Sequence, residues 1–185
     1  MVCDQPILFH TGNFEIARLL KSTIKEILKE KELKYIFVSH FESDECGGLT
    51  HILKEYPEAT VLCSEVTARE LKGFGFDFNT KIVKSGEVLK GEDFELEFIA
   101  YPAEMHLWEG LLAFEKKRAI FFSSDLMVNF GQSNGVVEKG NWTNLVNTVS
   151  LMQVANPEKL LKLQNSLSQL KPQFVATGHG QCFAL

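Results

Sequence analysis

The stretch VSHFESDECGG, residues 38–48, places charged side chains directly after an apolar run. That run, Tyr35–Ser39, predicts a buried strand. His40, Glu42 and Asp44 then occupy alternate positions, so in an extended chain their side chains point to one side. Imidazole and carboxylate groups gathered in this way are typical metal ligands. A solvated acidic loop is the alternative interpretation, and the segment alone leaves it open.

Three further residues that can bind metals also follow predicted strands. They are His106 in YPAEMHLWEG, Asp125 in FFSSDLM and His179 in ATGHG. Each alone is weak evidence, because a lone His usually makes an ordinary hydrogen bond and an Asp after a strand is most often a turn or helix cap. Ligands of open α/β sheets gather beyond the carboxyl ends of the strands. Four strand ends with metal-binding residues therefore predict one metal site.

The remaining pattern predicts alternating helices and strands. Apolar residues at helical spacing predict a helix over Phe14–Glu30 with Asn13 as its N-cap. Further helices are expected over Leu49–Tyr56, Glu65–Lys72 with Ser64 as cap, Asn141–Gln153, and Pro157–Leu170 with Asn156 as cap. Further strands are expected over Pro6–Phe9, Ala59–Cys63, Lys81–Val83, Phe94–Ala100, Leu111–Phe114, Ala119–Phe122 and Phe174–Thr177, those in the middle pairing as hairpins. This order suits layered sheets with helices outside.

Composition predicts one soluble domain over residues 1–185, with 45% hydrophobic and 23% charged residues. The net charge of −5 gives no reason to expect nucleic acid or an anionic membrane as a partner. No apolar run is long enough to span a bilayer, and the N-terminus lacks the basic region of a signal peptide. The 4 cysteines are scattered without a CxxC pair, which fits reduced thiols. We therefore expect a cytoplasmic protein.

The order of HFESDE, PAEMH, SSD and GHG resembles the metallo-β-lactamase superfamily. The most similar branch is the di-iron domain of flavodiiron proteins and their stand-alone oxygen-binding relatives. The resemblance runs from about Ile7 to the C-terminus and implies an α/β fold of the αββα sandwich type. This sandwich would be shortened at the N-terminus, because the usual strands before ILFHTG are absent. Hydrolytic members generally carry His where this chain has Glu42, as the di-iron branch does.

The resemblance also implies a ligand set for two iron ions. One iron would be bound by His40, Glu42 and His106, the other by Asp44 and His179, with Asp125 as the bridge. The di-iron enzymes have a His where this chain has Glu45, so the second iron would gain a carboxylate or stay more open. Carboxylate-rich sites suit iron, whereas structural zinc prefers Cys and His. Ligand type alone leaves manganese and zinc open. No flavin-binding loop is recognisable, so no flavin is expected in this chain.

Four other features lie near these motifs. Cys46 is either a redox-active thiol or extra ligand, or a small buried packing residue, which we favour. Trp108 is expected to line the metal pocket beside His106 and to restrict water there. His10 stands where the superfamily commonly has Asp, and we favour a structural hydrogen bond over a role beside the metals. The phenylalanines at 41 and 74–78 are expected in the core, with a pocket mouth or a homo-oligomer contact as alternatives.

The function that the resemblance implies is binding of dioxygen or nitric oxide at a ferrous pair. The protein would act as a sensor, or as a reductase component that takes electrons from an outside donor, so its status as an enzyme is left open. The alternative is a two-metal hydrolase acting on an ester, thioester or phosphoester. A degenerate fold member serving as an interaction module is a third interpretation, which the intact ligand set disfavours. A redox or signalling partner and a homo-oligomer stay open.

Overall fold

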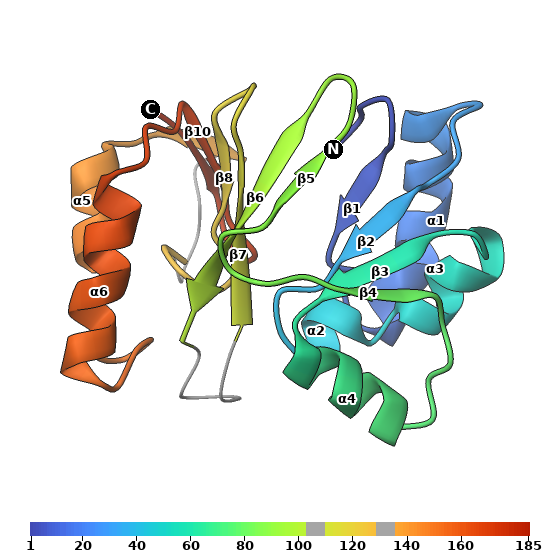
Figure 1. The fold of residues 1–185 in the computed structure, drawn as a ribbon. Coiled ribbons are helices and arrows are strands. Elements are labelled where there is room, and N and C mark those ends of the chain that lie inside the picture. Colours follow the sequence, from blue (N-terminus) through green and yellow to red (C-terminus); the bar gives the residue numbers. More distant parts are fainter. Residues whose placement is uncertain (103–109, 129–135) are drawn as a thin grey trace. The chain divides into compact units, whose positions relative to one another are not determined.

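The computed structural model describes residues 1–102, 110–128 and 136–185. They form two compact units, the first made of Met1–Lys84 with Gly91–Asp93 and the second of Ser85–Lys90 with Phe94–Leu185. Each unit has its own sheet, helices and hydrophobic core (Figure 1). The single domain expected from composition stays a prediction.

The first unit alternates strands and helices along the chain. Its elements are β1 (Ile7–Phe9), α1 (Phe14–Leu28), β2 (Tyr35–Phe37), α2 (Ser43–Cys46), α3 (Leu49–Glu55), β3 (Thr60–Cys63), α4 (Glu65–Gly73) and β4 (Thr80–Ile82). The strands form a parallel sheet in the order β1-β2-β3-β4. Helices α1 and α3 pack side by side against this sheet (Figure 1). Parallel pairing brings the carboxyl ends of β1 and β2 to one edge, where the first motif begins.

Capping side chains begin helices α1 and α4 where the sequence predicts. The Asn13 side chain accepts a hydrogen bond from the backbone N–H of Ile16 at 2.9 Å. The Ser64 hydroxyl accepts one from the N–H of Thr67 at 3.2 Å. Such caps satisfy N–H groups that have no partner inside the helix. Helix α1 then buries its apolar face, including Ala17, in the core of the unit.

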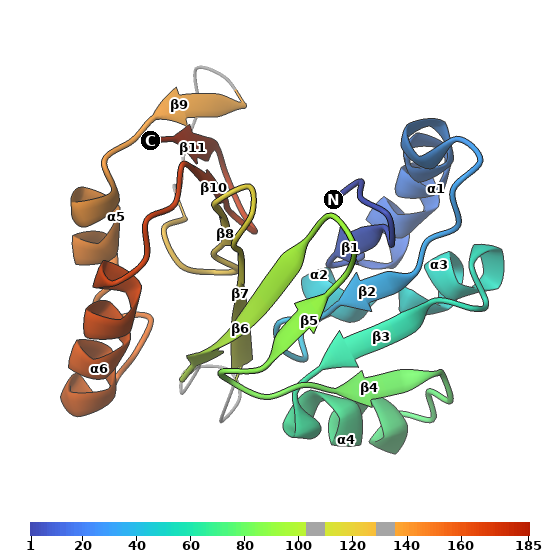
Figure 2. The same ribbon diagram turned by 45° about the horizontal axis from the view of Figure 1, so that its top comes forward.

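The second unit is built on a larger mixed sheet. Its elements are β5 (Val88–Lys90), β6 (Glu95–Tyr101), β7 (Gly110–Glu115), β8 (Ile120–Phe122), β9 (Val137–Lys139), α5 (Trp142–Thr148), α6 (Pro157–Ser168), β10 (Phe174–Ala176) and β11 (Cys182–Ala184). The sheet order is β5-β6-β7-β8-β10-β11-β9. Strands β5 to β8 pair antiparallel, whereas β8 and β10 are parallel. Helices α5 and α6 lie together along this sheet (Figure 2), and the Trp142 indole of α5 contacts the Phe121 ring of β8.

Several sequence predictions of local structure were wrong. Helix α2 (Ser43–Cys46) was not predicted, and the extended chain that the alternate spacing required does not continue beyond Glu42. Strand β4 pairs parallel with β3 instead of joining a hairpin. Helix α5 ends at Thr148, because Val149 has extended backbone and the Gln153 side chain accepts the backbone N–H of Ser150 at 3.0 Å. Strands β5, β9 and β11 were not predicted at all.

No helix within the described ranges is suited by length and apolar character to cross a membrane. The longest, α1, has 15 residues, whereas a membrane-spanning helix needs about 20.

Candidate metal centre

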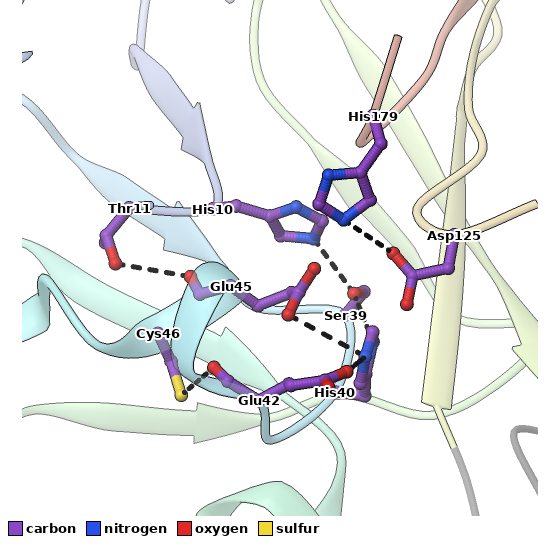
Figure 3. Close-up of polar contacts among 9 residues, drawn as sticks. All are labelled: His10, Thr11, Ser39, His40, Glu42, Glu45, Cys46, Asp125 and His179. Carbon is purple, nitrogen blue, oxygen red and sulfur yellow. Dashed lines mark hydrogen bonds and ion pairs between the residues drawn. The ribbon is translucent and has the colours of Figure 1, made fainter. Parts of the chain in front are cut away.

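The first motif sets one imidazole against two carboxylates. His40 is fully buried, and its Nε2 lies 3.1 Å from Oε2 of Glu42 and 3.8 Å from Oε2 of Glu45 (Figure 3). One ligand atom of each of these three residues lies within 4.8 Å of the others. The motif therefore gathers one imidazole and the carboxylates of Glu42 and Glu45, and Asp44 is not among these three.

Helix α2 explains how Glu45 reaches this group. The carbonyl of Glu42 accepts hydrogen bonds from the backbone N–H groups of Glu45, at 3.2 Å, and Cys46, at 3.0 Å. These bonds turn the chain after Glu42, whose own backbone is extended. A fully extended segment would have pointed Glu45 away from His40. Asp44 lies half-buried in the first turn of α2.

The donor set fits a metal cation. Only 1% of Glu45 is exposed, so its carboxylate is removed from water. Burying a carboxylate is costly unless positive charge and hydrogen bonds compensate for it. A neutral imidazole supplies no such charge, whereas a divalent cation held between these donors would. The burial also argues against Glu45 as an ordinary solvated residue.

The turn after β1 makes hydrogen bonds to residues of the first motif. Nε2 of His10 and the Ser39 hydroxyl are 2.9 Å apart, and the same hydroxyl lies 2.9 Å from Nδ1 of His40. The backbone N–H of Thr11 donates to the carbonyl of Glu45 at 2.8 Å. His10 thus makes the structural hydrogen bond that we favoured, and the Ser39 hydroxyl connects it to the candidate ligand His40. Sequence reasoning missed Ser39 and Thr11; a hydroxyl next to His40 was the available signal.

The second unit brings Asp125 and His179 together. Asp125 follows β8 and His179 follows β10, and the parallel pairing of these strands places their ends side by side. Nε2 of His179 lies 3.4 Å from Oδ1 of Asp125. The N–H of Gly178 donates to the carbonyl of Ser124 at 2.9 Å, which ties the two loops together. A Cβ on Gly178 would lie 2.8 Å from that oxygen, so glycine is required here.

The Cys46 thiol is a packing group in this structure. Cys46 is buried, and its Sγ donates to the carbonyl of Glu42 at 3.0 Å. Burial raises the pKa of this thiol to about 12, and the neighbouring carboxylates add to the effect. A thiol with so high a pKa is a poor nucleophile near neutral pH. The structural interpretation of Cys46 is therefore favoured over the redox one.

The other predicted residues have different outcomes. His106 and Trp108 lie outside the described residues. Phe41 packs its ring 5.2 Å from that of Phe74, and 69% of Phe74 is exposed. Core packing was therefore the wrong expectation for Phe74, because it follows α4 at the unit's surface.

Comparison with known proteins gives consistent matches. The model of the family described as ODP family beta lactamase matches residues 2–180. A protein of Nostoc sp. named as a diflavin flavoprotein is 32% identical over 124 residues, covering 66% of this chain and 21% of its own length. The anaerobic nitric oxide reductase flavorubredoxin of Salmonella arizonae is 25% identical over 132 residues, covering 70% of this chain and 27% of its own. The chain thus spans about a fifth to a quarter of these curated relatives.

A solved structure supports the same fold. A mutant flavo di-iron protein from Thermotoga maritima superposes with a TM-score of 0.78 at 20% sequence identity, over 96% of this chain and 46% of that one. This likeness confirms the predicted fold class, an α/β fold with two sheets and flanking helices. Together with the family match, it also confirms the resemblance drawn from the motifs. The individual ligand assignments stay predictions.

Proposed function

Because this chain belongs to the ODP β-lactamase family, we propose that it is a non-haem di-iron protein that binds dioxygen or nitric oxide. One observation carries the proposal: the buried His40 imidazole faces two carboxylates, of Glu42 and Glu45. Imidazole with anionic oxygen donors suits iron that must reach the ferric state. A hydrolytic zinc site in this superfamily would have a second imidazole at position 42.

The proposed ligand sets are those that the resemblance of the motifs implies. His40 and Glu42 would hold one iron together with His106, and Asp44 and His179 the other. Asp125 would bridge the two ions. The family match over residues 2–180 includes all six of these residues. Glu45 adds a carboxylate that the di-iron enzymes lack, and its burial beside His40 supports a role at the metals.

The side chains of the protein would hold the metal ions and keep part of their surroundings away from water. A ferrous pair, when bound, supplies the affinity for either gas and the electrons for its reduction. The buried His40 and Glu45 side chains keep one side of the site away from water, which strengthens their interaction with a cation. The hydrogen bonds from Thr11 to the Glu45 carbonyl fix the turn that carries this carboxylate.

Repeated reduction of a gas consumes electrons that His and carboxylate side chains do not store. The reductase form of the proposal therefore includes an external electron donor. Without such a donor the same site would be oxidised once and stay oxidised. That behaviour would suit a sensor with a signalling partner.

Anaerobic loading with ferrous iron tests the proposal. We expect tight uptake of iron, and a change in the visible spectrum on adding dioxygen or nitric oxide. Glu42→His should weaken iron binding relative to zinc, whereas Glu26→Gln, an exposed carboxylate on α1, should change neither. Strong preference of the unaltered protein for zinc, with turnover of a thioester or phosphodiester and no response to either gas, would support the hydrolase instead.

A further inference from the structure

A chain of hydrogen bonds connects the turn after β1 to the candidate ligand His40. Nε2 of His10 lies 2.9 Å from the Ser39 hydroxyl, which lies 2.9 Å from Nδ1 of His40 (Figure 3). Ser39 and His40 are fully buried. Nδ1 of His40 is therefore engaged by the hydroxyl, and its Nε2 faces Glu42 and Glu45. A metal ion would bind His40 through Nε2.

The number of protons on these groups decides which atom donates in each of the two hydrogen bonds. The Ser39 hydroxyl has one proton, so it donates to at most one of the two ring nitrogens. With a metal on Nε2, neutral His40 carries its proton on Nδ1 and donates it to the Ser39 oxygen. The hydroxyl proton is then available for Nε2 of His10, which accepts it. Neutral His10 would then carry its own proton on Nδ1.

The backbone holds His10 in place for this contact. His10 has φ of 60°, in the left-handed region, which His, Asn and Asp adopt more often than other residues with a Cβ. Its N–H donates to the carbonyl of Phe37 at 2.9 Å, and its ring lies nearly parallel to the Phe37 ring, with centroids 6.5 Å apart. These contacts hold the His10 ring beside the Ser39 hydroxyl.

We propose that Ser39 and His10 are positioning residues that fix the orientation and tautomer of His40 for metal binding through Nε2. This inference rests on the proposed function, since it requires a metal at His40. Groups that hydrogen-bond a metal-binding imidazole on its far side fix the ring and raise its basicity, and losing one typically weakens metal binding about 10- to 100-fold. His10, which stands where the superfamily commonly has Asp, would thus act on His40 through the Ser39 hydroxyl.

The test uses the full chain and Zn²⁺ as a diamagnetic probe. Ring ¹⁵N chemical shifts report the tautomers of His10 and His40 at about pH 8, where free imidazoles are neutral, and a competitive titration gives the zinc dissociation constant. Ser39→Ala removes the hydroxyl, and Ser39→Thr retains it. His10→Asn tolerates the left-handed backbone but is too short to replace Nε2. Ser22→Ala, whose hydroxyl donates to the Leu19 carbonyl on α1, is the matched control.

In the zinc-bound unaltered protein, the ¹⁵N shift of Nε2 of His40 should show metal binding, and Nδ1 of both histidines should carry a proton. Ser39→Ala should weaken zinc binding about 10- to 100-fold and mix the His10 tautomers, with Ser39→Thr restoring both and His10→Asn weakening binding as well. Unchanged affinity in Ser39→Ala and His10→Asn, with His40 still binding zinc through Nε2, would overturn the positioning role alone. Absence of any zinc effect on His40 in the unaltered protein would overturn the proposed metal site itself.

Discussion

Replacing Gly48 by Ala tests whether the turn behind the first motif is as tight as the structure shows. Gly48 is buried, and a Cβ there would collide with the Cβ of Ala17 on α1 and lie 3.0 Å from the Thr11 carbonyl oxygen. The N–H of Gly48 donates to Thr11 Oγ1 at 3.1 Å and to the Gly12 carbonyl at 3.0 Å, which holds Gly48 against Thr11. Ala17 is held in α1 by its own N–H, which donates to the Asn13 carbonyl at 2.9 Å. The added methyl group cannot be accommodated by a side-chain rotation.

The size of the effect follows from these contacts. Overpacking of a well-packed core costs about 1–3 kcal/mol, and a distorted buried hydrogen bond costs about 0.5–1.5 kcal/mol more. We therefore expect Gly48→Ala to lower the free energy of unfolding of the metal-free protein by about 2–4 kcal/mol. Because Thr11 also binds the Glu45 carbonyl, its displacement should move Glu45 and weaken metal binding as well.

Urea unfolding of the metal-free variant measures the first effect, and a zinc titration measures the second. Gly73→Ala is the control, since Gly73 ends α4 and a Cβ there meets no atom within 4 Å. This control should stabilise the protein by up to about 1 kcal/mol, the difference in helix propensity. Equal unfolding free energies for Gly48→Ala and the unaltered protein would refute the packing described here.

Three further predictions concern the ligands and their neighbours. Asp125→Ala should lose both irons together, whereas His106→Ala should retain more of the second iron. Metal analysis measures the iron content, with Asp77→Ala, an exposed carboxylate, as the control. Full iron retention in both ligand variants would mean that these residues are not ligands. Glu45→His should raise the reduction potential of the iron, because it removes a negative charge; an unchanged potential in spectroelectrochemistry would mean that Glu45 does not act on the metals. At pH 8 a thiol with a pKa of about 12 is thiolate in roughly one molecule in ten thousand, so Cys46 should resist alkylation until the protein unfolds; rapid labelling of Cys46 in the native protein, located by mass spectrometry, would contradict its buried environment.

The sequence predicted those features that depend on long patterns or on strand ends. Helix α1 has 15 residues, about four turns, with regular apolar spacing and an Asn13 cap, and it forms as expected. Asp125 and His179 meet because parallel strands β8 and β10 end at the same edge, which is the reasoning that linked the motifs.

Short elements and contacts between distant segments could not be predicted in this way. Helix α2 has 4 residues and strands β5, β9 and β11 have 3 each, too few to show a period. The position of Glu45 depends on α2, so the sequence left its role open. The contact between His10 and Ser39 joins residues 29 apart, and only the pairing of β1 with β2 brings them together.

The proposed function requires that the histidine and carboxylate side chains of this chain bind a pair of iron ions. Low-temperature Mössbauer and electron paramagnetic resonance spectra of the oxidised, ⁵⁷Fe-loaded protein test it most directly. A carboxylate such as Asp125 that bridges two ferric ions couples their spins, so we predict about two irons per chain with a diamagnetic ground state. Spectra of magnetically isolated ferric ions, or uptake of a single iron per chain, would contradict the proposed di-iron site.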